Sequence, residues 1–252
     1  EQVIRRRAAL RLRWDFQGYS ANSLMTGNWE EAQARLRALA QRDQWRPLRV
    51  TRIVDESASI RSLYLEPADA GGWPVFAAGQ HLPLRLSIAE HAQPLIRTYS
   101  LSSAPSDGHI RISVKAQGRA SRHLHEQLRV GDILQARPPL GGFTLKTDSP
   151  RPVVLIGAGV GITPLLSMAR ELVEQIGTQQ RAEPVYLFQG GRTAQELPFQ
   201  NELRQLTQRA AGLLHLQRAL SAPETGALPG RDYEIAGHLS FKQIKAHLPL
   251  DD

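Results

Sequence analysis

The stretch around residue 157 limits the possible folds of this chain more than any other. A continuous apolar run at residues 153–156 is followed by the glycine-rich residues 157–161 and then by Thr163-Pro164. The apolar run predicts a strand that is covered on both faces. Thr163 can cap a helix and Pro164 suits its first position, so a helix is expected to begin there. Strand, tight turn and helix together predict a unit of a parallel α/β sheet.

The chain after this turn keeps the same alternation of strand and helix. Buried strands are predicted at residues 185–188 and 213–217, and helices at residues 199–208 and 241–247, the last one capped by Ser240. Parallel strands that are joined by helices predict a doubly wound α/β sheet.

The chain before the turn has a different pattern, in which Gly, Pro, Asp and Ser separate short β-like runs. The runs lie at residues 48–54, 60–65, 81–86, 96–102, 109–115 and 133–137. Such a pattern predicts a six-stranded antiparallel β-barrel. One helix interrupts it after residue 120, with Ser121 as its expected cap.

Three regions are therefore expected. They are a helical segment at residues 1–47, a barrel at residues 48–148 and an α/β domain at residues 152–252, with a proline-rich linker between the last two. Within the first region, Asn28 and Glu31 resemble a capping box, which predicts a helix that ends before Pro47.

Positive charge is concentrated near the N-terminus. Residues 1–50 hold ten arginines and five acids, whereas the whole chain has a net charge of +7. Such a segment suits an acidic protein or domain, an anionic membrane surface, a nucleic acid or simple exposure to solvent. Aromatic side chains do not alternate with the arginines, which disfavours nucleic acid.

Composition excludes several classes of site within this sequence. It contains no cysteine, so it holds no disulfide, zinc–thiolate site or iron–sulfur cluster of its own. His123 and His125 are only two residues apart, which does not place them on one helix face, and no metal site is predicted. No apolar run approaches the roughly 18 residues of a membrane span. Nor is there the apolar core of a secretory signal, so a cytoplasmic location is expected.

Two polar segments of the barrel region indicate a cofactor. Arg97 and Tyr99 lie on one face of a predicted strand, where a guanidinium can clamp a phosphate and a phenol ring can lie against a flat cofactor. Gly118 and Ser121 precede a short helix whose first amides can bind a second phosphate. Together they predict a nucleotide-like ligand on the barrel.

The order and spacing of these segments resemble the ferredoxin–NADP reductase superfamily over about four-fifths of the chain. Residues 97–100 resemble its flavin-binding R-x-Y-S motif, and Gly79-Gln80 resembles the strand before it. Residues 118–121 resemble its flavin-phosphate G-x-x-S, and residues 157–164 resemble its nicotinamide-nucleotide G-x-G-x-G-x-T-P.

This resemblance implies a flavin on the barrel that meets a nicotinamide nucleotide at the cleft between two domains. Arg97 would hold a flavin phosphate, Tyr99 would stack on the isoalloxazine and Ser100 would lie near flavin N5, which makes Tyr99 and Ser100 the candidate catalytic residues. The complete set of implied cofactor-binding residues is Arg97, Thr98, Tyr99, Ser100, Val114, Lys115, Gly118, Ala120, Ser121, Gly157, Ala158, Gly159, Val160, Gly161, Thr163, Pro164 and Arg192.

Two features of the cofactors stay open at this point. The residues after Gly118 favour FAD, with FMN as the alternative. Arg192 follows the second strand of the α/β region, where it can meet a 2′-phosphate or lie in solvent, so NADPH and NADH are equally compatible.

The implied function is a flavin-dependent NAD(P)H oxidoreductase that passes electrons to an iron–sulfur or other one-electron acceptor, fused or separate, as in the reductase component of an oxygenase. The family's pattern continues past Asp252 into a further strand and a cysteine-containing motif, and a [2Fe–2S] domain is expected only outside the given residues. Because that strand and motif are missing from this sequence, a non-catalytic flavin-binding module with a degenerate nucleotide domain is the alternative.

Overall fold

The structure is a computed structural model, and it describes residues 44–88, 93–145 and 151–249. Residues 45–252 form one compact unit. The helix predicted near Asn28, most of the predicted linker, and Asp251 and Asp252 lie outside the described residues.

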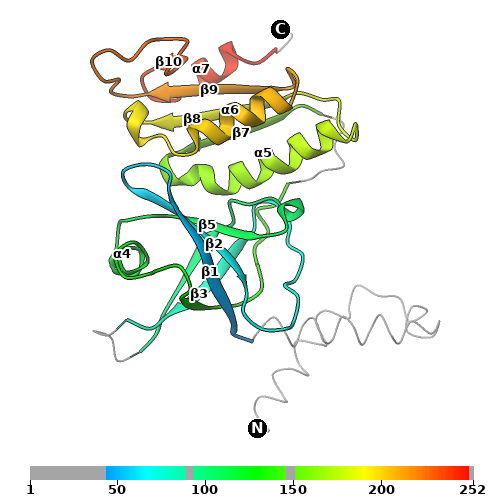
Figure 1. The fold of residues 1–252 in the computed structure, drawn as a ribbon. Coiled ribbons are helices and arrows are strands. Elements are labelled where there is room, and N and C mark those ends of the chain that lie inside the picture. The colour runs from blue at the N-terminus through cyan, green and yellow to red at the C-terminus, as the bar shows by residue number, and fades with distance from the viewer. Residues whose placement is uncertain (1–43, 89–92, 146–150, 250–252) are drawn as a thin grey trace, which may run out of the picture. The chain divides into compact units, whose positions relative to one another are not determined.

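The first part of this unit is the predicted antiparallel barrel (Figure 1). Its strands, in the described residues, are β1 (Arg46–Asp55), β2 (Ile60–Pro67), β3 (His81–Leu86), β4 (Leu95–Ser100), β5 (Ile110–Lys115) and β6 (Ile133–Ala136). They are ordered β4-β3-β6-β1-β2-β5, and a bridge between Leu101 and Ile112 joins the two ends of the sheet. Each strand places alternate apolar residues in one buried core, as Leu48 and Val50 do on β1.

The second part is the predicted α/β sheet. Four parallel strands, β7 (Val153–Ala158), β8 (Val185–Gly191), β9 (Leu214–Leu220) and the short β10 (Ile235–Ala236), are ordered β10-β9-β8-β7 in the described residues. The helices are α5 (Ile162–Gly177), α6 (Gln200–Arg209) and α7 (Phe241–Ala246). None of the helices in the described part of the chain is both long and apolar enough to cross a membrane.

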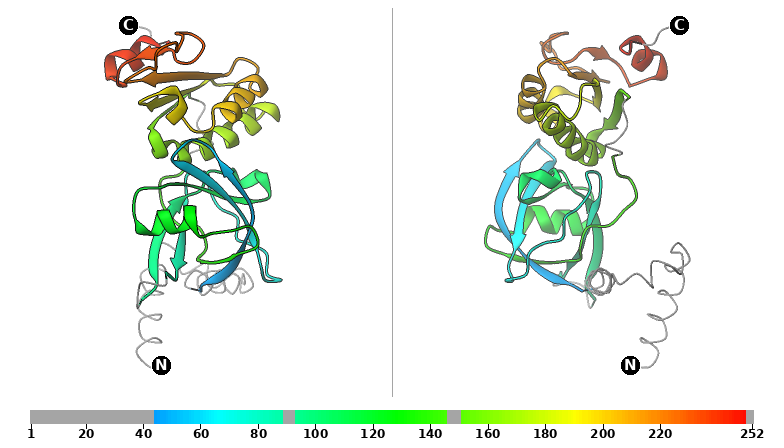
Figure 2. Two further views of the ribbon diagram at one scale, coloured as in Figure 1. Left: turned by 60° about the vertical axis from the view of Figure 1, so that its left-hand side comes forward. Right: turned by 90° about the vertical axis from the view of Figure 1, so that its right-hand side faces the viewer.

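Alternation along β8 explains why helices cover both faces of this sheet (Figure 2). Val185 and Leu187 pack in one core with α5 and α6, whereas Tyr186 and Phe188 pack with Ile244 of α7 on the other side. The strand is therefore apolar on both faces, as a buried parallel strand must be.

Two predicted helix starts are corrected. The helix α4 (Arg119–Glu126) begins before Ser121, so Ser121 lies in its first turn rather than at its cap. Likewise α5 begins at Ile162, with Thr163 and Pro164 inside its first turn. In both cases a glycine, Gly118 or Gly161, occupies the cap position, and no side-chain capping hydrogen bond forms there.

The cap predicted for the last helix is confirmed. The Ser240 hydroxyl accepts the amide of Gln243, and the Gln243 side chain returns to the Ser240 amide. The short 3₁₀ helices η2 (Pro105–Asp107), η3 (Gly159–Gly161) and η4 (Ala194–Glu196) and strand β10 were not predicted, because single turns carry no periodicity.

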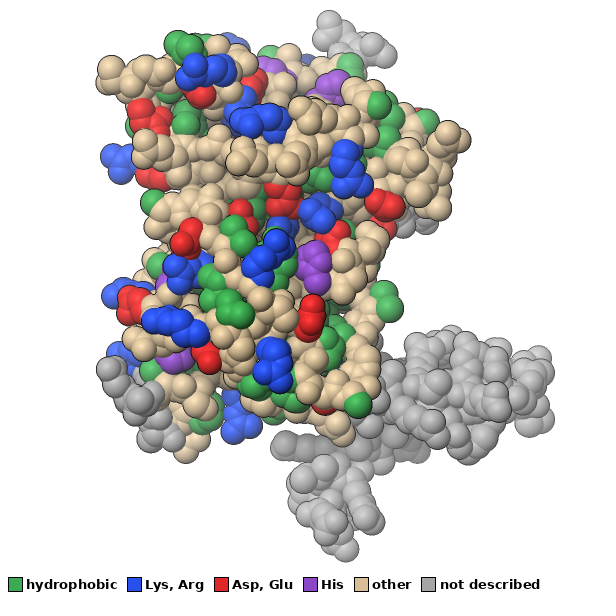
Figure 3. Space-filling view, viewed as in Figure 1, with side chains coloured by type: hydrophobic (Ala, Val, Ile, Leu, Met, Phe, Trp, Pro, Cys, Tyr) green, Lys and Arg blue, Asp and Glu red, His purple; other side chains and the backbone are tan. Residues whose placement is uncertain are grey.

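The barrel and the α/β sheet keep largely separate apolar cores. The barrel core includes Val114 and Leu124. Among the described residues, the barrel part of the chain contributes only Ala78 to the main α/β core, with partly buried Leu145 packed against it. On the face drawn in Figure 3, acidic and basic side chains are intermixed rather than segregated. Because the two apolar cores are largely separate, the junction between the halves is more polar than either core.

Candidate functional site

The strand with the predicted flavin residues lies at one end of the barrel sheet. β4 pairs with β3, so that Tyr99 lies opposite Leu82 and Ser100 lies opposite His81. Arg97 and Thr98 are exposed, whereas Tyr99 is half-buried against the barrel core. Burial raises the pKa of the Tyr99 phenol, and the nearby Arg97 opposes this only in part. The strand therefore presents a neutral ring with an exposed guanidinium beside it.

The start of α4 can receive a phosphate. No side chain in the described residues forms a capping hydrogen bond at this helix start, and the amides at a helix start can bind a phosphate. The Ser121 hydroxyl accepts the amides of Gln117 (3.0 Å) and Gly118 (2.9 Å), which fixes the turn before the helix. A phosphate-bearing cofactor on the barrel fits this arrangement.

The strand β5 leads into this turn. Val114 is buried in the barrel core and Lys115 is half-buried at the end of the strand. His125 of α4 forms a 2.7 Å hydrogen bond with the carbonyl of Val114, so the histidine ties the helix to the strand. Among the described residues, no group of three or more His, Cys, Asp or Glu side chains is placed to hold a metal ion.

The glycine turn follows β7 at the carboxyl edge of the parallel sheet. A Cβ on Gly157 would lie 2.6 Å from the Leu165 side chain and 3.2 Å from the Gly161 carbonyl, so a larger residue there would have to displace its neighbours. Gly159 has a φ of +52° and a Cβ there would meet no atom within 4 Å. Thr163 donates to the Val160 carbonyl at 3.0 Å. Open space in front of an uncapped helix start suits a nucleotide phosphate.

The flavin strands and the glycine turn approach each other. β5 contacts η3, and β4 contacts β5. The Ser167 hydroxyl of α5 donates at 2.7 Å to the carbonyl of Ser103. Ser100 precedes that carbonyl by three residues and Thr163 precedes Ser167 by four. The structure thus brings both predicted segments to one junction between the halves.

A carboxylate occupies the end of β8, near the predicted Arg192. Arg192 is exposed, and its carbonyl accepts the Ala222 amide at 2.8 Å. The Glu224 carboxylate accepts the amides of Ala194 (3.0 Å) and Gln195 (3.1 Å) at the start of η4, which lowers its pKa. Sequence reasoning missed Glu224, because only the pairing of β8 with β9 brings it beside Arg192.

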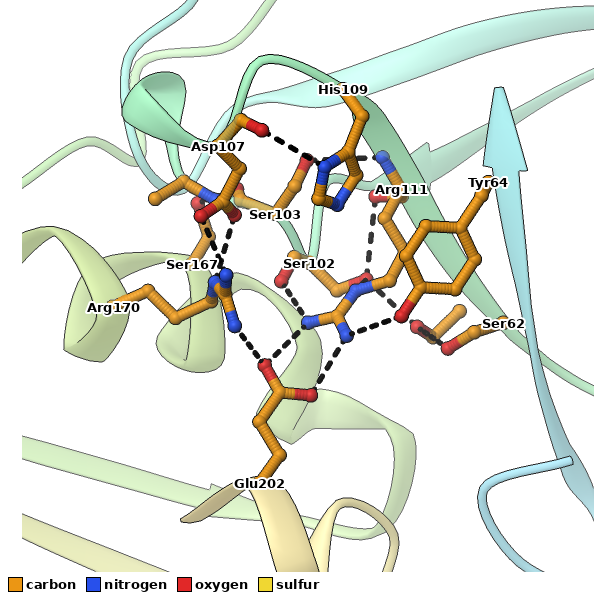
Figure 4. A network of polar contacts seen from close by, with 12 residues as sticks. Ser62, Tyr64, Ser102, Ser103, Asp107, His109, Arg111, Ser167, Arg170 and Glu202 are labelled. Carbon is orange, nitrogen blue, oxygen red and sulfur yellow. Dashed lines mark hydrogen bonds and ion pairs between the residues drawn. The ribbon is translucent and has the colours of Figure 1, made fainter. Parts of the chain in front are cut away.

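A polar network joins the barrel to α5 and α6 (Figure 4). Glu202 of α6 accepts from both ends of the Arg111 guanidinium, at 2.7 and 3.0 Å, and from Arg170 of α5 at 2.5 Å. Arg170 also donates twice to Asp107 of the barrel, at 2.8 and 2.5 Å. We call these four residues the Arg111–Glu202 network.

The network is largely buried, and Arg111 is its most buried member. The side chain of Arg111 is 3% exposed, and it also donates to the Ser102 carbonyl at 2.5 Å and to the Ser102 hydroxyl at 3.1 Å. Burial opposes the charge of Arg111, but the Glu202 carboxylate outweighs it and raises the pKa. Burial likewise raises the pKa of Asp107, but the hydrogen bonds and charge of Arg170 prevail and lower it. Arg111, Arg170 and Asp107 are therefore charged at neutral pH.

A cavity of about 760 Å³ lies next to the network. Its walls come from both halves, with Arg52, Tyr64 and His109 on the barrel side and Phe199 and Gln205 on the other. The Arg52 guanidinium lies 3.6 Å from the centre of the Tyr64 ring. The two halves therefore meet through discrete contacts beside a hollow rather than through continuous apolar packing.

Sequence reasoning missed the Arg111–Glu202 network. One signal was present: Arg111 stands between Ile110 and Ile112 in a predicted strand, where a charge on a buried strand needs a partner. Nothing in the sequence pointed to Glu202, which lies 91 residues away.

The fold and this site define a class: two-domain oxidoreductases with a flavin-binding barrel and a nicotinamide-nucleotide-binding α/β sheet. Comparison with known proteins agrees. The model of the oxidoreductase FAD-binding domain matches residues 47–145, and that of the oxidoreductase NAD-binding domain matches residues 155–248. The chain belongs to the ferredoxin–NADP reductase superfamily.

The most similar sequences include flavohemoproteins. The chain is 36% identical to that of Deinococcus radiodurans over 238 residues, 93% of this chain and 54% of that protein. It is 36% identical to that of Chromobacterium violaceum over 217 residues, 82% of this chain and 52% of that protein. The chain thus spans about half the length of the curated relatives it matches.

Solved structures share the fold. The flavohem-like FAD/NAD-binding domain of nitric oxide dioxygenase from Vibrio cholerae superposes with a TM-score of 0.68 at 28% identity, covering 81% of this chain and 82% of that one. The cytochrome b5 reductase domain of Ulva prolifera nitrate reductase gives a TM-score of 0.66 at 17% identity over 81% of this chain and 82% of that one, which shows the fold alone.

Proposed function

We propose that this chain takes electrons from NADH and delivers them singly to a haem-containing acceptor through a bound FAD. A bound flavin supplies the conversion between the two-electron chemistry of a nicotinamide and the one-electron chemistry of a metal centre. The chain's own residues bind the two cofactors, align them and keep water from the space between them. The junction where β4, β5 and the glycine turn approach one another carries this proposal.

The proposed roles follow from the positions of the side chains. Tyr99 offers its half-buried ring to the flavin, Ser100 offers a hydroxyl at the end of the same strand, and Arg97 offers an exposed cation to a phosphate. The start of α4 takes a second phosphate, since its amides are uncapped by any described side chain. The turn at residues 157–163 takes the pyrophosphate of the nucleotide.

The preference for NADH rests on Glu224. In parallel sheets of this kind the adenosine ribose lies at the end of the strand next to the glycine turn, here β8. The Glu224 carboxylate fills the amide pair at 194 and 195 that a 2′-phosphate would otherwise occupy. Its oxygens keep acceptor capacity for a ribose hydroxyl and repel a phosphate.

The acceptor is inferred from the relatives. Those that match at 36% identity are flavohemoproteins, whose name couples a flavin to a haem. The match to the Deinococcus radiodurans protein covers 93% of the chain and so reaches into the residues that precede the barrel. We therefore favour a haem group, fused or separate, over the iron–sulfur centre expected from the family as a whole.

One experiment tests the proposal. The purified chain, reconstituted with FAD, is mixed anaerobically with NADH, and the flavin absorbance is followed by stopped flow. Rapid bleaching, followed by recovery of the absorbance when a haem protein is added as oxidant, supports the proposed function. Bound flavin that NADH and NADPH leave unbleached would favour the non-catalytic flavin-binding module instead.

A further inference from the structure

We propose that Glu202 is a positioning residue: it fixes the tilt of the α/β half on the barrel and thereby the approach of nicotinamide to flavin. This inference rests on the proposed function for its catalytic consequence. The structural claim, that the Glu202 carboxylate fixes the angle between the halves, rests only on its contacts with Arg111 and Arg170.

Glu202 links the two arginines of the network, one from each half. Its carboxylate bonds both Arg111 of the barrel and Arg170 of the α/β half. Arg170 in turn bonds Asp107 of the barrel. Two charge-assisted pairs thus cross the junction, Arg111–Glu202 and Arg170–Asp107. Glu202 forms the first pair and also bonds Arg170, which donates in the second. Because an Arg–carboxylate pair holds two parallel bonds in one plane, it fixes orientation as well as distance.

The other described contacts between the halves fix the angle less firmly. One of them sets Gly79 of the barrel against the flexible end of the Met168 side chain. Beside the network lies the cavity of about 760 Å³, which leaves room for the halves to tilt. The single hydrogen bond from Ser167 to Ser103 gives one point of attachment, which does not define an angle.

The position of the network makes the tilt relevant to the chemistry. Arg111 lies on β5, the strand whose end carries Val114 and Lys115, and Arg170 lies on α5, the helix that begins at the glycine turn. A rotation that lengthens the Arg111–Glu202 contact therefore moves the nucleotide turn relative to the flavin strands. Misplacement by about 1 Å costs on the order of a hundredfold in rate for transfers that need close contact.

The test compares Glu202→Gln with a matched control, Glu174→Gln. Gln keeps the size of the side chain and removes its charge. Glu174 also pairs with an arginine, Arg209 at 3.3 Å, but this pair is exposed and lies within the α/β half. Because the sequence contains no cysteine, Glu66→Cys on the barrel and Gln208→Cys on α6 can be spin-labelled selectively in each background. Pulsed electron–electron double resonance then gives the distribution of distances between the two spin labels, one on each half.

We expect a narrow distribution in the parent and in Glu174→Gln, and one at least twice as wide in Glu202→Gln. With FAD bound, the rate constant of flavin bleaching by NADH should fall tenfold or more in Glu202→Gln, whereas the dissociation constants of FAD and NADH stay within twofold. A role in stability alone would not separate rate from binding in this way. Asp107→Asn weakens only the Arg170–Asp107 pair and should show a smaller change of the same kind. This variant replaces Glu202→Gln in the test if Glu202→Gln does not fold.

An unchanged distance distribution in the folded variants would overturn the inference, and so would an unchanged bleaching rate. Failure of the proposed function is distinguishable from either result. It would leave the parent unbleached by NADH, while the distance measurement, which needs no nucleotide, still reports on the network.

Discussion

Gly79 lies where the barrel touches α5, and its replacement by alanine should destabilise the protein more than its backbone conformation alone predicts. Its φ is +98°, and a Cβ would lie 2.2 Å from the Phe143 carbonyl oxygen and 2.4 Å from the methyl group of Met168. Gly131 has nearly the same φ, +99°, but a Cβ there would meet nothing within 4 Å. Gly131→Ala is therefore a matched control for strain without collision.

The two substitutions separate two costs. Left-handed backbone costs an alanine about 1–2 kcal/mol, and both variants should lose this much. Only Gly79→Ala must also move the Phe143 carbonyl, because a side chain can rotate away but a backbone oxygen cannot. Such overpacking costs a further 1–3 kcal/mol, roughly. We expect a loss of about 2–5 kcal/mol for Gly79→Ala and about 1–2 kcal/mol for Gly131→Ala.

Urea unfolding followed by tryptophan fluorescence, without added cofactor, measures both values. The slope of the free energy against urea must be the same in each variant for the comparison to hold. Met168→Ala alone should cost about 2–5 kcal/mol, because it truncates a buried side chain. In that background Gly79→Ala should still cost nearly as much as in the parent, since the carbonyl remains in place. Equal losses for Gly79→Ala and Gly131→Ala, or no further loss from Gly79→Ala in the Met168→Ala background, would refute the steric reasoning.

Three further predictions concern cofactor binding and pH. Ser121→Ala leaves the amides of Gln117 and Gly118 without their acceptor, so FAD affinity by fluorescence titration should fall about tenfold, or roughly 1.4 kcal/mol; the same change at Ser240, the cap of α7, should leave it within twofold. Glu224→Gln removes the charge that repels a 2′-phosphate, and the ratio of kcat/KM for NADH to that for NADPH should fall about tenfold; an unaltered ratio would show that specificity lies elsewhere. The pKa of Asp107 is lowered in the folded protein, so its stabilising effect is complete above the unfolded value of about 3.9 and disappears as the pH falls through the folded value. Below about pH 4 the unfolding free energy of the parent should accordingly decline more steeply than that of Asp107→Asn, and parallel curves would contradict this assignment.

The sequence predicted the fold well because periodicity and glycine placement act locally. The prediction located all six barrel strands, the strands β7, β8 and β9 of the α/β half, and the helices α4 to α7. Their ends are displaced by a few residues. The helix starts at Gly118 and Gly161 were misplaced because Ser121 and Thr163 are good caps that happen to serve inside the first turn. The side chains of both bind backbone groups of the preceding turn instead.

The site divides in the same way. Arg97, Tyr99 and the glycine turn belong to short motifs that resemble those of a known family, so roles could be assigned to them from that resemblance, and those roles stay predictions. Glu202 and Glu224 belong to no motif, because each acts on a segment that only the folded chain brings near. Long-range electrostatic partners of this kind are not encoded in local pattern.

The separate cores of the barrel and the sheet have a consequence for protein engineering. Since few apolar side chains cross the junction, either half can be exchanged for its counterpart from a relative without repacking an interior. Such a chimera would be limited by charge matching at four positions, 107, 111, 170 and 202. Chimeras that preserve both arginines and both acids should keep the junction between their halves, whereas chimeras that bring two like charges together there should be less stable.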